Sequence, residues 1–91
     1  MILKTVSITV TGKVQGVWFR KYTMDKAQEL GVKGFVKNLP DDSVYIVATG
    51  DSEQLKELEN WCWQGSPKSK VSSVDVTTME ISNFSSFTNK K

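Results

Sequence analysis

Histidine is absent from this 91-residue sequence, which contains a single cysteine, Cys62, and a single arginine, Arg20. The lack of histidine excludes zinc sites built on cysteine and histidine, and it excludes a serine or cysteine nucleophile activated by an imidazole. One cysteine forms no disulfide bond within the chain, which fits a reducing compartment. We therefore expect a cytoplasmic protein in which Cys62 is a small buried apolar residue rather than a reactive thiol.

Long apolar runs are also missing. No stretch approaches the ~18 residues of a membrane-spanning helix, and the opening residues MILKTV become polar too soon for a signal peptide. The net charge of +2, from 12 basic and 10 acidic residues, is too small to indicate nucleic acid or a membrane surface as a partner. With no linker composition, we expect one monomeric domain, residues 1–91, with its own core.

The first third of the chain predicts a strand, a loop and a helix. Residues 5–11 alternate strictly, with valine and isoleucine on one face and threonine and serine on the other, as in a half-buried strand. Residues 12–19 then form a loop. Residues 20–30 favour a helix, which Gly31 is suited to end.

The middle of the chain predicts a hairpin. Residues 32–39 and 43–50 are rich in strand-forming side chains and are separated by the turn sequence PDDS, with Pro40 suited to its first corner.

A second helix follows this hairpin. Asp51 or Ser52 can cap its start, and Gln54 stands where a capping box needs it. Leu55, Leu58 and Cys62 mark its buried stripe, and the glycine and proline that follow end it.

Two further strands are expected near the C-terminus. Residues 70–81 have a looser strand pattern, and residues 84–88 (FSSFT) are a short edge strand, after which the last few residues fray. The order strand-helix-strand, strand-helix-strand predicts an α+β fold of the ferredoxin-like split β-α-β type, with an antiparallel sheet and two helices on one face.

A nine-residue motif, GKVQGVWFR at positions 12–20, carries the most specific information, together with GFVKN at 34–38. It resembles the acylphosphatase family, whose pattern is G-x-V-Q-G-V-x-F-R after the first strand and G-x-V-x-N in the second. The matching residues are Gly12, Val14, Gln15, Gly16, Val17, Phe19, Arg20, Gly34, Val36 and Asn38.

The resemblance implies an enzyme that hydrolyses the mixed anhydride of a carboxylic acid and phosphoric acid. It implies a small-molecule acyl phosphate as substrate, inorganic phosphate as product, and neither a metal nor a cofactor. In the family the arginine binds the phosphate and the asparagine orients the attacking water, which here implies Arg20 and Asn38 as catalytic residues.

The residue chemistry is compatible with these roles. A guanidinium offers paired, planar donors that fit two phosphoryl oxygens, and the amides of a tight glycine-containing loop at a helix start form an anion cradle. Asn38 cannot act as a base at neutral pH, but its amide can orient a water. Orientation suffices because a carboxylate leaves without protonation. The expected phosphate-binding loop consists of Gln15, Gly16, Val17, Trp18, Phe19 and Arg20.

Two rival functions use the same fold. One is a non-catalytic module that binds acyl phosphate or carbamoyl phosphate, because domains that resemble acylphosphatases occur inside larger enzymes. We favour a free-standing enzyme, since the chain has no room for a second domain. The other rival is an RNA-binding domain, which we disfavour because the first strand has no aromatic residue and the charge is small. We expect Trp18, Phe19, Tyr22 and Phe35 to pack in the core or loops.

One position departs from the family pattern. The hairpin turn usually carries glycine where this chain has Asp42. If that position requires a positive φ, aspartate tolerates it better than most residues. The departure therefore concerns the shape and stability of the turn rather than the chemistry.

Overall fold

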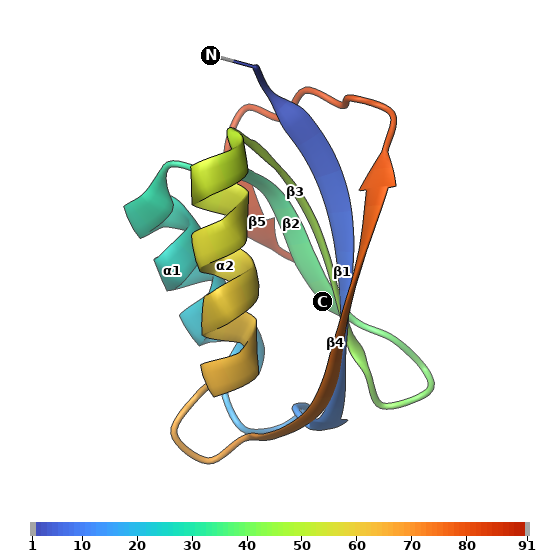
Figure 1. The fold of residues 1–91 in the computed structure, drawn as a ribbon. Helices are drawn as coiled ribbons and strands as arrows, with labels where there is room; N and C mark the ends of the chain where they lie inside the picture. Colours follow the sequence, from blue (N-terminus) through green and yellow to red (C-terminus); the bar gives the residue numbers. More distant parts are fainter. Residues whose placement is uncertain (1, 91) are drawn as a thin grey trace.

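The computed structural model describes residues 2–90 and has two layers, a five-stranded sheet and a pair of helices that cover one of its faces (Figure 1). No helix among the described residues has the length and apolar character needed to cross a membrane. The elements are β1 (Lys4–Lys13), α1 (Phe19–Leu30), β2 (Lys33–Asn38), β3 (Val44–Gly50), α2 (Ser52–Gln64), β4 (Lys70–Met79) and β5 (Phe87–Asn89).

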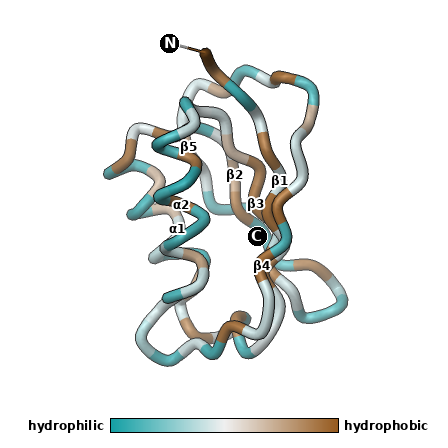
Figure 2. Tube along the Cα trace, viewed as in Figure 1, coloured by the Kyte–Doolittle hydropathy of each residue, from teal (hydrophilic) through white to brown (hydrophobic). Residues whose placement is uncertain are grey.

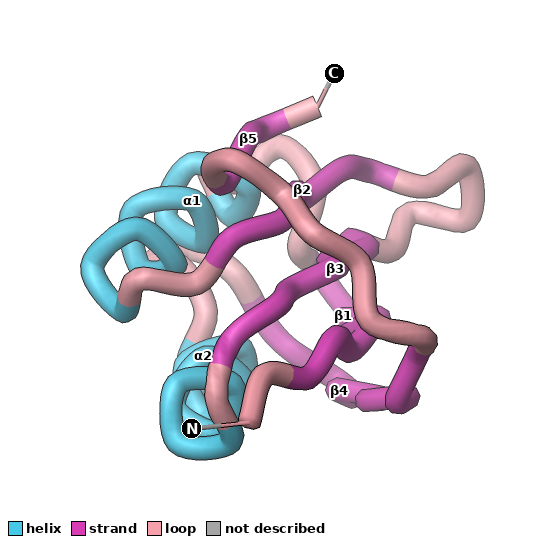
Figure 3. The backbone as a smooth tube through the Cα atoms, turned by 90° about the horizontal axis from the view of Figure 1, so that it is seen from above, coloured by secondary structure: helices cyan, strands magenta, loops and turns pink. Residues whose placement is uncertain are grey.

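The strand order is β4-β1-β3-β2-β5. The first four strands pair antiparallel in the order of a split β-α-β fold, which confirms the predicted fold class. The expectation of a wholly antiparallel sheet is wrong at one edge, where β5 runs parallel to β2. The cause is visible in Figure 3, where residues 80–86 leave β4 and cross to the opposite edge before the chain turns back.

The core lies between the helices and the sheet. Val6, Ile8 and Val10 of β1 point into it, as their alternation predicted, and Leu58 and Cys62 of α2 are fully buried against them. Figure 2 shows hydrophobic positions recurring along the central strands. Burial raises the pKa of the Cys62 thiol to about 12, so this cysteine is an apolar core residue as expected.

The crossing segment, residues 80–86, explains why Thr5 is buried although its strand position predicted exposure. The Thr5 and Thr49 hydroxyls are 2.7 Å apart on the face of the sheet away from the helices. The Ser82 amide donates to the Thr5 hydroxyl over 2.9 Å, and Thr49 donates to the Ser82 carbonyl over 2.7 Å. Phe84 covers the same face by packing edge-on against Phe35.

The first strand extends beyond its predicted C-terminal end. The first strand continues through Gly12, which was expected to open the loop, because a bulge between Thr11 and Gly12 keeps it paired with β4. Gly12 has φ 124°, and a Cβ there would lie 2.2 Å from the Lys70 carbonyl oxygen, so glycine is required.

The C-terminal residues up to Lys90 also differ from the prediction that they fray, whereas Lys91 lies outside the described residues. The fifth strand covers residues 87–89 rather than 84–88, and its Phe87 side chain is buried in the core. Beyond the strand, the Lys90 amide donates to the Val36 carbonyl of β2 over 2.8 Å. The described chain is therefore hydrogen-bonded to its end.

The start of α2 confirms the predicted capping box. The Asp51 carboxylate accepts from the Gln54 amide, and the Gln54 side-chain oxygen accepts from the Asp51 amide. The same Gln54 side chain donates to the Leu30 carbonyl at the end of α1 over 2.8 Å, which ties the two helices together.

The β2–β3 turn contains the unusual aspartate. Asp42 has φ 73°, in the left-handed region that glycine occupies without steric cost. Its neighbour Asp41 shapes the turn, because the Asp41 carboxylate accepts from the hydroxyl and the amide of Ser43. These two bonds hold the pKa of the Asp41 carboxyl below its usual range.

Replacing Asp42 with glycine tests the cost of this conformation. We expect Asp42→Gly to raise the free energy of unfolding by up to ~1 kcal/mol, measured by urea denaturation, because the left-handed conformation is then free of Cβ strain. Asp41→Ala is the matched control and should lower it, since the Ser43 donors lose their acceptor. A loss of stability in Asp42→Gly would mean that the Asp42 side chain supports the turn.

Candidate functional site

A pocket of about 300 Å³ opens where the β1–α1 loop, the first turn of α1 and the end of β2 meet. It contains most of the residues that the sequence predicted for the site, including both candidate catalytic residues. Gln15 and Val17, also predicted, do not line it. The lining residues are Val14, Gly16, Trp18, Phe19, Arg20 and Asn38.

The β1–α1 loop supplies several of the residues that line this pocket. Gly16 and Trp18 both have left-handed φ values, of 72° and 65°. Trp18 is the N-cap of α1, no side chain caps the helix, and its first turn holds no acidic residue. Within residues 2–90, the amides of residues 16–21 have no hydrogen-bond acceptor. The partial positive charge of the helix start is thus left available to an anion.

Apolar anchors fix the loop on both sides of these amides. Val14, Val17 and Phe19 are buried, while Gly16 and Trp18 between them are exposed. The Phe19 ring packs against Trp61 of α2 with the ring centroids 5.3 Å apart. The alternation holds the loop in one conformation and turns its remaining positions toward solvent.

Two side-chain hydrogen bonds, which sequence reasoning missed, tie the loop to its neighbours. The Gln15 side-chain amide donates to the carbonyls of Leu39 and Ser43, over 2.8 and 2.9 Å, and so joins the loop to the β2–β3 turn. From the other side, the buried Ser66 hydroxyl donates to the Val17 carbonyl over 2.8 Å. Gln15 therefore has a structural role through its side chain, which the sequence did not predict, and its expected backbone role in phosphate binding stays a prediction.

Arg20 is oriented by the C-terminal segment. Its Nη1 donates to the Lys90 carbonyl over 2.8 Å, and the Lys90 amide is in turn bound to Val36 of β2. This chain of contacts brings the guanidinium beside the end of β2, where Asn38 is exposed. No carboxylate among the described residues lies within ion-pair distance of Arg20, so its charge is available to a ligand.

Two aromatic residues of this region are more exposed than predicted. Trp18 has 70% of its surface exposed and Tyr22 has 43%, whereas Phe19 is buried as expected. The left-handed conformation of Trp18 turns its side chain out of the core. Helix periodicity does not predict this exposure.

The fold and this pocket define a small α+β domain with a candidate anion-binding site, in which free amides, a guanidinium and a carboxamide share one cavity. A family model described as Acylphosphatase matches residues 6–89. A curated acylphosphatase from Shewanella amazonensis is 46% identical over 78 residues, which are 86% of this chain and 86% of that protein.

Solved structures agree with this match. An acylphosphatase from Coxiella burnetii has a TM-score of 0.93 and 38% identity, over 97% of this chain and 93% of that one. HypF from T. kodakarensis has a TM-score of 0.84 and 27% identity, over 97% of this chain but 12% of HypF. The chain belongs to the acylphosphatase family, which confirms the resemblance carried by the motif at 12–20.

The link between the loop and the hairpin turn can be tested through Gln15. We expect Gln15→Leu to lower the free energy of unfolding by about 1–3 kcal/mol, because two hydrogen bonds to partly buried carbonyls are lost. Urea denaturation measures this change. Gln28→Leu, on the exposed surface of α1, is the control and should change stability little. Equal effects of the two substitutions would show that the Gln15 bonds contribute nothing.

Proposed function

We propose that this pocket is the active site of an acylphosphatase, which hydrolyses the carboxyl-phosphate anhydride of acyl phosphates. The observation that carries the proposal is the meeting of three donors in one cavity: the acceptor-free amides at the start of α1, the Arg20 guanidinium and the Asn38 carboxamide. The family membership of the chain supports the same reaction.

The phosphoryl group would bind against the loop and Arg20. A phosphoryl transition state carries its charge on three equatorial oxygens. The planar guanidinium can donate to two of them, and the amides around Gly16 and Trp18 can donate to the third. Because Lys90 and Val36 hold Arg20 in place beforehand, little reorganisation is needed when charge develops.

Asn38 would orient the water that attacks. Its carbonyl oxygen can accept a hydrogen bond from the water while its amide donates to a neighbouring oxygen. The oxygen of the water bonds to phosphorus, the bond from phosphorus to the bridging oxygen breaks, and its electron pair leaves with the carboxylate. The proton of the water passes to a phosphate oxygen. Positioning and charge stabilisation supply the catalysis.

The rival function, a non-catalytic module that binds acyl phosphate or carbamoyl phosphate, would use the same pocket. The likeness to a short part of HypF favours keeping this candidate, because a domain of this shape occurs within a longer chain. Release of inorganic phosphate from acetyl phosphate by the purified chain separates the two functions. The cytoplasmic location and the monomeric state expected from the sequence stay predictions.

The roles of Arg20 and Asn38 predict different kinetics. Arg20→Lys keeps the charge but loses the paired donors, so both substrate affinity and kcat should fall steeply. Asn38→Ala should lower kcat by orders of magnitude and leave inhibition by inorganic phosphate nearly unchanged, because Asn38 contacts the water. Asn60→Ala, on the exposed surface of α2, is the control.

Calorimetric titration of folded variants with phosphate decides this division of labour. If Asn38→Ala loses phosphate binding as fully as Arg20→Lys, the two residues share one role. If both variants hydrolyse acetyl phosphate at the wild-type rate, the active site lies elsewhere.

The phosphate-binding role of the loop can be observed without turnover. We expect inorganic phosphate to shift the backbone amide resonances of residues 15–20 in a titration followed by NMR, because those donors gain an acceptor. Phosphate should also inhibit competitively. Amides near the capping box of α2, at the opposite end of the molecule, serve as the internal control. Shifts that avoid the loop would contradict the proposed cradle.

A further inference from the structure

A second pocket, of about 240 Å³, adjoins the candidate active site. The two pockets share Gly16 and Trp18, so they form a continuous surface around the tip of the β1–α1 loop. The second pocket lies between this loop, the first turns of α1 and the α2–β4 loop. Its other lining residues are Val17, Tyr22, Pro67 and Lys68.

Trp18 lines both pockets. A bulky residue with φ 65° is rare, and its strain persists only where the surrounding structure over-determines it. Here the buried side chains of Val17 and Phe19 on either side hold the backbone. The result is an indole that is 70% exposed beside the acceptor-free amides, where burial in the core does not explain it.

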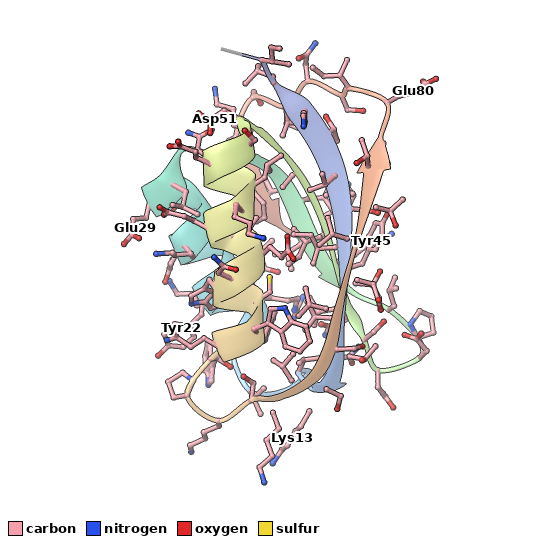
Figure 4. The ribbon with its side chains drawn as sticks, in the orientation of Figure 1. Lys13, Tyr22, Glu29, Tyr45, Asp51 and Glu80 are labelled. Atoms are coloured by element: carbon pink, nitrogen blue, oxygen red, sulfur yellow. The ribbon has the colours of Figure 1, made fainter. Side chains whose placement is uncertain are left out.

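Tyr22 adds a second aromatic surface one helical turn later. The Tyr22 amide donates to the Trp18 carbonyl over 3.0 Å, which fixes the relative position of the two residues. Figure 4 shows Tyr22 at the end of the molecule where the β1–α1 and α2–β4 loops lie. Pro67 and Lys68 of the α2–β4 loop complete the pocket. The hydrogen bond from the Ser66 hydroxyl to the Val17 carbonyl joins that loop to the β1–α1 loop.

We propose that this second pocket binds the acyl group of the substrate, and that it selects acyl phosphates with a planar, aromatic acyl group. The inference rests on the proposed function, because the phosphoryl group must occupy the first pocket. Only one oxygen separates the phosphorus from the acyl carbon, so the acyl group must emerge next to the phosphate cradle. The shared residues Gly16 and Trp18 lead from that position into the second pocket.

The chemistry of the pocket fits one ring. Two aromatic side chains and a proline offer flat apolar surfaces, on which an aromatic acyl group gains both burial and ring contacts. The volume of about 240 Å³ is smaller than the 300–1,000 Å³ typical of sites for drug-sized ligands. An acetyl group, by contrast, ends at its methyl and contacts little of this surface.

Substrate specificity tests the proposal. The quantity measured is the ratio of kcat/KM for benzoyl phosphate to kcat/KM for acetyl phosphate, so that general losses of activity cancel. We expect Trp18→Ala and Tyr22→Ala each to lower this ratio by about three- to tenfold, since each removes one aromatic contact to the ring. Trp18→Phe should restore most of the ratio. Trp63→Ala removes a comparably exposed tryptophan, at 52%, that lines neither pocket, and should leave the ratio unchanged.

Binding of stable analogues separates this proposal from the proposed function. In phenacylphosphonate and acetonylphosphonate a methylene group replaces the bridging oxygen of the two substrates, so binding is measured without turnover. We expect the wild-type protein to bind phenacylphosphonate about tenfold more tightly, and Trp18→Ala to lose most of that preference.

The outcomes are distinct. If both phosphonates bind equally well to the wild-type protein, or if Trp18→Ala keeps the substrate ratio, the acyl pocket is refuted while the phosphate site stands. If the wild-type protein binds neither phosphonate and hydrolyses neither substrate, the proposed function fails and the acyl pocket fails with it.

Discussion

The architecture of the site depends on one stretch of backbone that is held with its amides unsatisfied. Between the end of β1 and the first turn of α1, buried Val14, Val17 and Phe19 alternate with exposed Gly16 and Trp18. The buried side chains fix the loop, and the exposed positions adopt left-handed conformations. No side chain caps the start of α1, so its first amides keep no partner within the described residues. A helix start without a cap is unfavourable by itself, and it becomes useful when an anion completes it.

Much of the fold could be predicted because its signals are local. The alternation in residues 5–11, the capping box at Asp51 and the buried stripe of α2 each determine an element from a few neighbouring side chains. The parallel β5 and the burial of Thr5 could not be predicted in this way. Both follow from the path of residues 80–86 across the sheet, and that path depends on contacts between residues more than 30 positions apart.

The same distinction applies to the candidate site. The motif at 12–20 indicated Arg20, and the pattern at 34–38 indicated Asn38, because those roles require particular side chains. The group that holds Arg20 in place belongs to the backbone rather than to a side chain. Arg20 donates to the backbone carbonyl of Lys90, and a carbonyl is present in every residue, so no sequence pattern marks it. The exposure of Trp18 likewise follows from a backbone angle rather than from its residue type.

A bulky aromatic residue in a left-handed conformation is a local cost that a small domain tolerates only with firm support. The support here comes from three directions: the Gln15 bonds to the hairpin turn, the Ser66 bond to Val17, and the packing of Phe19 on Trp61. Each of these contacts reaches a different part of the fold, so the loop conformation is maintained by the β2–β3 turn, the α2–β4 loop and α2 together. Cradle geometry is therefore a property of the whole fold, and the exposed Trp18 stands where the candidate active site meets the second pocket.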